Sequence, residues 1–259
     1  MSMGNLITET LVLPSAAAKL YGSGFDGHLT LRAMTTNEER IRLSSQSFFP
    51  TMRTIVNDCI VENKNSDGTY KIDSASFTEF DFFAIMVKLR IISYGVKYRT
   101  AAICPNCGHK FEYKADLSQL MYNLVPDDFV EPYEIGPLPG SGDTLGCRFM
   151  RIKDRIDIEK KRDLILSKDP KYQGDPTFNL EMERRIVTVN GKELDFLMAE
   201  DYVKNMIAMD SYVYHDKIDQ FPFGVVRLNT CDCENPDCDG KALWVLKADG
   251  EFFRPCFDN

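Results

Sequence analysis

Two groups of closely spaced cysteines are the residues of this chain that could do chemistry. The first group is the stretch Cys104-Pro105-Asn106-Cys107-Gly108, a Cys-x-x-Cys turn followed by glycine. Such a turn places two thiolates side by side, and its glycine adopts backbone angles that a side chain would oppose. Pro105 fixes φ within the turn and donates no hydrogen bond, so neighbouring backbone N–H groups are free to face the sulfurs. The pattern is typical of one half of a structural zinc site.

The second group must supply the other two ligands, because structural zinc is bound by four. It has the spacing Cys-x-Cys-x-x-x-x-Cys and therefore offers three thiols for two positions. Aligning Ile103-Cys104 with Thr230-Cys231 favours Cys231 and Cys238 as the ligands. Cys233 is the alternative to Cys231, because Cys-x-x-x-x-Cys also suits a zinc loop. We expect one structural zinc ion, bound by Cys104, Cys107, Cys231 and Cys238.

Four thiolates would close such a site, so that no position remains for a catalytic water. The zinc would then join distant parts of the chain rather than take part in a reaction. A less favoured interpretation is that one of the two groups consists of reduced, solvated thiols that bind no metal. A redox role for the first pair is weaker still, since a redox Cys-x-x-Cys lies at a strand-to-helix turn and strands are predicted on both sides here. Of the remaining cysteines, Cys59 lies on an apolar helix stripe and is expected in the core, while Cys147 and Cys256 have no assigned role.

No arrangement typical of an active site is found in the sequence. The three histidines, His28, His109 and His215, share no metal-ligand spacing. No glycine-rich stretch has the strand-then-helix context of a phosphate loop, and there is no Gly-x-Ser-x-Gly motif. The sequence therefore predicts that the chain is not an enzyme and has no small-molecule substrate.

The composition narrows the choice of partners and compartment. A formal net charge of −8 and the absence of long basic runs argue against nucleic acid as a partner. No stretch approaches the roughly 18 to 20 apolar residues of a membrane span, and residues 1–14 lack the pattern of an export signal. We therefore expect no membrane partner and a location in the cytoplasm, where paired cysteines are more often metal ligands than disulfides.

The cysteines are expected on strands that extend from a helical core. Residues 77–92 form the strongest predicted helix, and its apolar residues surround so much of its circumference that it should be the core of the first half. Residues 96–103 and 110–114 flank the first cysteine turn as the strands of a hairpin. A further strand at residues 221–228 leads into the second cysteine group.

The order of elements in the first half recurs in the second. Leu13-Pro14-Ser15 has a counterpart in Leu138-Pro139-Gly140, and each is followed by a strand, a charged helix and later a cysteine group. A helix at residues 200–209 would correspond to the predicted core helix. The expected fold is therefore α+β, with two pseudo-repeated α/β halves at residues 1–126 and 138–259. The halves would be joined by a linker at residues 127–137 and by a zinc-ribbon-like pair of cysteine knuckles.

Several motifs together carry a resemblance to a known family. They are Leu13-Pro14-Ser15, Leu31-Arg32-Ala33-Met34-Thr35-Thr36, Leu89-Arg90-Ile91-Ile92-Ser93-Tyr94-Gly95, Cys104-Pro105-Asn106-Cys107 and Phe252-Phe253-Arg254-Pro255. In these motifs the chain resembles the baseplate hub proteins of T-even-type contractile-tailed bacteriophages. It departs from the family at Ala33, where the family has proline, and in the spacing of the second cysteine group.

The resemblance implies a non-enzymatic structural component or assembly factor of the phage tail baseplate. Such a protein binds other tail proteins and is made in the host cytoplasm, and then either stays in the tail baseplate of the virion or leaves it. Residues 1–13, a mildly apolar arm, and the group Phe252, Phe253 and Arg254 are the expected partner-binding segments, because aromatic residues and arginine often anchor interfaces. In the other interpretation the two rings close the core of the second half.

Two other classes of function compete with this one. A zinc-ribbon protein that binds nucleic acid is the alternative, but phosphate contacts supply much of such affinity and the chain is acidic. Retention on DNA that depends strongly on salt would support it. The third class is an enzyme with an unrecognised site, and an inert protein with stoichiometric zinc would count against that.

Overall fold

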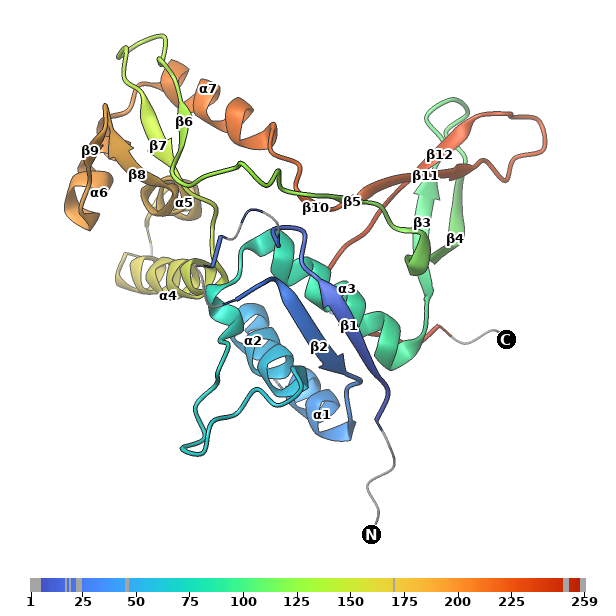
Figure 1. Cartoon of the computed structure of the whole chain (residues 1–259). Helices are drawn as coiled ribbons and strands as arrows, with labels where there is room; N and C mark the ends of the chain where they lie inside the picture. Colours follow the sequence, from blue (N-terminus) through green and yellow to red (C-terminus); the bar gives the residue numbers. More distant parts are fainter. Residues whose placement is uncertain are drawn as a thin grey trace.

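The computed structural model describes residues 6–16, 18, 20–21, 25–44, 47–169, 171–248 and 252–256. Within these ranges the chain combines seven α-helices with four small sheets, which agrees with the expected mixture of helix and sheet (Figure 1). Among the helices described, none has the length and apolar character needed to cross a membrane. The first five residues of the predicted arm lie outside the described residues.

The chain starts with a two-stranded antiparallel sheet that packs on helices. Its strands are β1 (Thr8–Val12) and β2 (His28–Arg32), followed by α1 (Thr36–Ser44) and α2 (Phe48–Cys59). Strand β2 alternates as a half-buried strand does, because Leu29 and Leu31 are buried while His28 and Thr30 are exposed. Most of the described part of the predicted arm is therefore strand β1, paired with β2.

Helix α3 (Glu79–Tyr94) is the centre of the larger core, which we call the first core (Figure 1). The helix begins at Thr78, whose hydroxyl accepts a hydrogen bond from the N–H of Asp81 at 3.3 Å. It ends at Gly95, where φ is 83° and favours glycine. Its side chains are buried on almost every side, as the apolar pattern of residues 77–92 predicted, so the predicted core helix is confirmed.

A second core lies in the middle part of the sequence, around a four-stranded sheet in the order β6-β7-β8-β9. The strands are β6 (Tyr133–Ile135), β7 (Leu145–Cys147), β8 (Ile186–Val189) and β9 (Lys192–Glu193). Four helices belong to the same region, on the side of the molecule away from β3 and β4 in Figure 1. They are α4 (Ile152–Lys168), α5 (Thr177–Arg185), α6 (Phe196–Asn205) and α7 (Ala208–Asp219).

Two sequence-based expectations change in this region. The helix expected at residues 200–209 is interrupted at Met206, whose ψ of 130° ends α6 before α7 begins. The expected linker at residues 127–137 contains β6, and both Tyr133 and Ile135 are buried in the second core. That segment is therefore held in place, because the backbone of β6 pairs with β7 and the side chains of Tyr133 and Ile135 are buried.

The hairpin predicted around the first cysteine pair joins a second hairpin in one antiparallel sheet, in the order β11-β12-β3-β4. The strands are β3 (Lys97–Ile103), β4 (Lys110–Asp116), β11 (Leu228–Asp232) and β12 (Lys241–Val245). The single strand expected at residues 221–228 is instead two separate strands, at residues 224–225 and 228–232. The hairpins meet where β12 pairs with β3, through Leu243 opposite Ile103 and Trp244 opposite Ala102. A further strand pair, β5 (Tyr122–Asn123) with β10 (Gly224–Val225), lies between this sheet and the second core (Figure 1).

The segment at residues 252–256 returns to the first core, which corrects one expectation. Phe252 and Phe253 are 0% and 2% exposed and pack in the first core, so neither ring is exposed for a partner. Arg90 of α3 is fully buried and donates hydrogen bonds to the carbonyl oxygens of Phe252 at 2.9 Å and Arg254 at 3.1 Å. The rings are buried because this fixed backbone directs them inward, into the first core rather than the second. The side chain of Arg254 is exposed.

Candidate metal centre

Four cysteine thiols converge at the tips of the two hairpins. The Sγ atoms of Cys104, Cys107, Cys233 and Cys238 all lie within 4.8 Å of one another. Cys104 and Cys238 are separated by 3.8 Å between their sulfurs, and Cys107 and Cys233 by 3.7 Å. None of the eight cysteines forms a disulfide. Two segments more than a hundred residues apart in the sequence therefore contribute two thiols each to one cluster.

The spacing of the sulfurs fits a tetrahedrally coordinated ion. Zinc–sulfur bonds of about 2.3 Å, arranged as a regular tetrahedron, give sulfur–sulfur edges of about 3.8 Å. Two separations in the cluster, 3.7 and 3.8 Å, agree with this edge length. A disulfide would need about 2.05 Å, so these contacts are not disulfide bonds. The cluster can hold a metal ion of that size.

Cys233, and not Cys231, belongs to the cluster, which corrects the expected ligand set. Cys231 lies opposite Ala242 within the β11–β12 ladder. Cys231 and Cys233 are two residues apart, so a regular strand turns both side chains to the same face but about 7 Å apart along its axis. That displacement keeps the sulfur of Cys231 one pleat away from the tip, where the other three thiols meet.

The strand registers of the two hairpins explain why Cys233 takes the same position in the second hairpin as Cys104 takes in the first. In the first hairpin Ile103, just before Cys104, pairs with Lys110, and in the second Asp232, just before Cys233, pairs with Lys241. Each first cysteine then donates its backbone N–H to the carbonyl oxygen of the residue before that lysine, at 2.9 Å to His109 and 3.1 Å to Gly240. The second loop is the first with two additional residues.

This register follows from the sequence of the second strands once the strand pairing is known. The stretches Cys107-Gly108-His109-Lys110 and Cys238-Asp239-Gly240-Lys241 align without a gap, and counting back across the strands from each lysine gives Cys104 and Cys233. The alignment that favoured Cys231 started from the other strand and required a longer insertion in the turn.

Backbone amides around the cluster stabilise thiolates. The N–H groups of His109, Asn235 and Gly240 donate to the sulfurs of Cys107, Cys233 and Cys238 respectively, in each case from two residues further along the chain. The bond from His109 is the largest cause that lowers the pKa of Cys107, to about 6. Of these donors, the N–H of His109 follows the Cys-Pro-x-Cys turn, near which free amides were expected.

Cys233 and Cys238, whose pKa values are raised, resist ionisation when no cation is present. The amide of Asn235 alone would lower the pKa of Cys233, but desolvation and the neighbouring sulfurs of Cys107 and Cys104 raise it to about 12. A bound cation would remove this opposition, because metal binding deprotonates cysteine ligands.

Packing holds the two loops against each other. Cys104 is fully buried, Cys107 is exposed, and the other two thiols are half-buried. Gly108 has a φ of 71°, as expected for the residue after the first pair. Gly240 lies against Asn106, and a Cβ added there would be 2.8 Å from Asn106 Nδ2. A larger residue at this position would displace the Asn106 side chain, so glycine allows the close approach of the two loops.

The cysteines outside the cluster behave as core residues where they are buried. Cys59 is fully buried in the first core, as predicted from its position on the apolar stripe of α2. Cys147 is equally buried in the second core. Burial raises the pKa of each thiol to about 12, which makes both unreactive at neutral pH.

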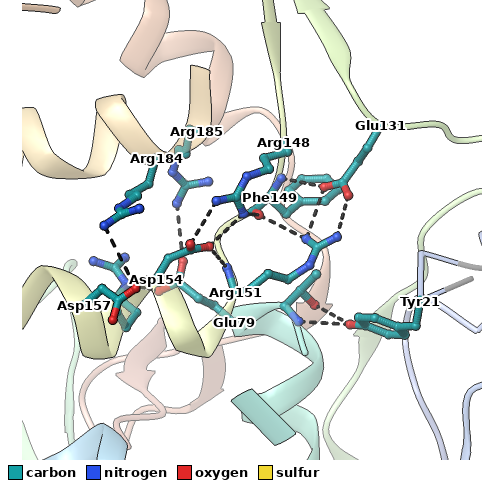
Figure 2. A network of polar contacts seen from close by, with 12 residues as sticks. Tyr21, Glu79, Glu131, Arg148, Phe149, Arg151, Asp154, Asp157, Arg184 and Arg185 are labelled. Atoms are coloured by element: carbon teal, nitrogen blue, oxygen red, sulfur yellow. Dashed lines mark hydrogen bonds and ion pairs between the residues drawn. The ribbon is translucent and has the colours of Figure 1, made fainter. Parts of the chain in front are cut away.

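A network of arginines and carboxylates joins α4 and α5 to the start of α3 (Figure 2). This network was not predicted from the sequence. Arg148 binds Asp154 with two hydrogen bonds of 2.7 and 2.9 Å, and it also donates to the carbonyl of Phe149. Arg32 makes the same contacts with Glu38 and with the carbonyl of Ala33. In both cases the acid follows its arginine by six residues, a spacing that could have been recognised in the sequence.

The chain is a bacteriophage baseplate protein. A family described as T4 bacteriophage base plate protein matches residues 11–170, which is more than half of the chain, and the chain belongs to that family. The resemblance to T-even-type baseplate proteins is thereby confirmed. The matched region contains β2, α3 and the first cysteine pair but ends before the second pair. No curated protein and no solved structure gives a significant match.

Proposed function

We propose that this baseplate protein is a non-enzymatic structural component or assembly factor of the phage tail, that it binds other tail proteins, and that one structural zinc ion stabilises it. The observation that carries the zinc part is the four-thiol cluster, in which sulfur separations of 3.7 and 3.8 Å match the edges of a zinc–thiolate tetrahedron. Membership of the baseplate family supports the role in the tail.

Zinc is the metal that the donor set favours. Four thiolates in a tetrahedral arrangement suit zinc or iron, and soft sulfur ligands disfavour magnesium and calcium. With four protein ligands the coordination is complete, so the ion supplies folding energy rather than a reactive water. The ligands are Cys104, Cys107, Cys233 and Cys238.

The zinc ion would stabilise a short contact between two hairpins. The register between β12 and β3 comprises only two residue pairs, Leu243 with Ile103 and Trp244 with Ala102. A tetrathiolate site at the adjacent hairpin tips would fix this register and so hold β11 and β12 to the first core.

We infer that the two halves arose by duplication and are joined by a zinc-ribbon-like pair of knuckles. The contacts of Arg32 and Arg148 are one support. A second is that Asp81 of α3 accepts the backbone N–H of Ser15 at 3.1 Å, while Asp210 of α7 accepts that of Gly140 at 2.7 Å, so each Leu-Pro turn is held by a buried aspartate. The domains proposed from sequence are residues 1–126 and 138–259. The C-terminal end of the second is better assigned to the first, because the first core contains Ala242, Trp244, Leu246, Phe252 and Phe253.

The protein is proposed to be made in the host cytoplasm and to contact tail proteins during assembly. Arg254, which is exposed, remains a proposed partner contact, whereas the buried rings beside it do not. The described part of the arm, residues 6–13, exposes Leu6, Ile7 and Val12, at 45%, 61% and 53%, and stays a second proposed contact.

Mass spectrometry of infected cells tests the role in the tail. Peptides of this chain are quantified in purified virions and in lysate from the same infection, and tails are imaged in an infection that lacks the gene. A structural component gives virion peptides and defective baseplates, and an assembly factor gives lysate peptides alone with the same defect. Normal tails without the protein would overturn the proposal.

A further inference from the structure

A cleft of about 590 Å³ opens between the start of α3, the helices of the second core and the segment at residues 218–228. We propose that this cleft binds an acidic peptide segment of a partner protein, with one carboxylate beside an aromatic or aliphatic side chain. The proposal rests on the proposed function, because it supplies the site at which another tail protein would be held. The cleft is separate from the cysteine cluster.

One wall of the cleft consists of aromatic rings. Tyr133 and Phe221 have ring centroids 4.7 Å apart, and Phe80 meets Phe149 edge to face at 5.1 Å. Phe223 lies against both Phe80 and Phe149, at 6.0 and 5.8 Å. These rings are drawn from four separate segments and form a fixed apolar surface, which suits an aromatic or aliphatic side chain.

The lining of the cleft also carries guanidinium groups, and one of them has no acid partner among the described residues. Arg155 and Arg185 both bind Glu79, as Figure 2 shows for Arg185. Arg227 packs over the ring of Phe83 at 4.2 Å, and among the residues that the structure describes its guanidinium forms no hydrogen bond or ion pair. Desolvation lowers the pKa of Arg227, the charge of Glu79 raises it, and the charge of Arg155 lowers it further. An incoming carboxylate would bind Arg227 without breaking an existing pair.

Tyr133 contributes its ring, and not its hydroxyl, to the cleft. The residue is 8% exposed, lines the cleft and belongs to its aromatic wall. Its hydroxyl oxygen is buried away from solvent, close to the guanidinium of Arg185, and burial raises the pKa of this phenol. The contact of Tyr133 with a ligand in the cleft is therefore apolar.

The charge of the cleft favours a carboxylate over a phosphate. Arg155, Arg185 and Arg227 are the cations of its lining, and Glu79 and Asp219 are its anions. The excess is therefore one positive charge, which matches one carboxylate. A doubly charged phosphate would experience repulsion from both acids, and a nucleotide would bring several such charges.

A peptide-display selection tests the proposal. A random hexapeptide library is selected on the full-length, metal-loaded protein, and the same library is selected on Arg227→Gln. The expected peptides contain Asp or Glu beside an aromatic or aliphatic residue. Synthetic copies should bind about tenfold to a hundredfold more weakly to Arg227→Gln by calorimetry, in line with the loss of a charge-assisted hydrogen bond.

The matched control is Arg40→Gln, which removes a cation from the exposed face of α1 and should leave peptide binding unchanged. Replacing the peptide's acid by its amide tests the same contact from the peptide side, which keeps the test valid if Arg227→Gln fails to fold. Peptides without acids, equal binding to Arg227→Gln, enrichment of no sequence, or equal affinity for ATP would overturn the proposal. Zinc content and tail morphology are measured separately, so a failure here leaves the proposed function standing.

Discussion

Replacing Arg90 by methionine should destabilise the protein by about 3 to 5 kcal/mol. This is the range found when one partner of a buried charged interaction is removed. Arg90 is fully buried and donates to four carbonyl oxygens, at 2.7 Å to Gly95, 2.7 Å to Lys97, 2.9 Å to Phe252 and 3.1 Å to Arg254. The Phe252 carbonyl is buried and the other three acceptors are partly buried, so each one left without a donor costs up to about 1 to 3 kcal/mol. Release of the desolvation cost of the guanidinium, several kcal/mol, offsets part of that sum.

The assay is denaturant unfolding of the metal-loaded protein, with Arg99→Met as the matched control. Arg99 is a half-exposed arginine of β3 that pairs with Glu112 at 3.3 Å, so its replacement should cost no more than about 1 kcal/mol. Arg90→Met should also expose residues 252–256 to protease under native conditions, because two of the lost bonds hold that segment. Equal stability of the two variants would refute the interpretation that Arg90 fixes the returning segment.

Three further predictions concern the first core and its acids. Phe83→Ala should cost about 3 to 5 kcal/mol in denaturant unfolding, as for other large cavities in cores, and an effect within error would mean that α3 is not packed as described. Phe252→Ala should cost a similar amount, less if combined with Phe83→Ala, since the rings are 6.3 Å apart and share one cavity. Burial alone would raise the pKa of Glu38, but hydrogen bonds from Arg32 and Thr35 lower it to about 2 from 4.5. The resulting stabilisation, up to about 3 kcal/mol, is complete above about pH 4.5 and is lost as the pH falls toward 2, and Glu38→Gln should flatten this dependence in acid titrations of unfolding.

Local patterns predicted the elements that depend on local chemistry. The apolar circumference of residues 77–92 predicted α3 because a helix buried on all sides leaves that signature in its own sequence. The Cys-Pro-x-Cys-Gly turn predicted the first hairpin, since its glycine and its amide donors act within a few residues. In each case the residues that determine the structure are neighbours in the chain.

Contacts between distant segments were harder to predict. Arg90 binds backbone carbonyls of residues 252 and 254, and carbonyl groups carry no sequence signal, so the return of that segment to the first core was missed. The choice between Cys231 and Cys233 depended on which residues pair between β11 and β12. Aligning the first strands of the two hairpins selected Cys231, two residues before the cysteine that belongs to the cluster. The cleft beside Arg227 combines residues from both halves, and no single stretch of sequence contains it.

The most direct test of the account is the zinc content of three purified proteins, measured by elemental mass spectrometry. The natural chain and Cys231→Ser should each carry about one zinc ion per chain, whereas Cys233→Ser should lose the metal and unfold at lower denaturant concentration, since structural zinc contributes folding free energy. Cys59→Ser, a change at a thiol outside the cluster, controls for the loss of a cysteine as such. No zinc in the natural chain, or zinc retained by Cys233→Ser and lost by Cys231→Ser, would contradict the account.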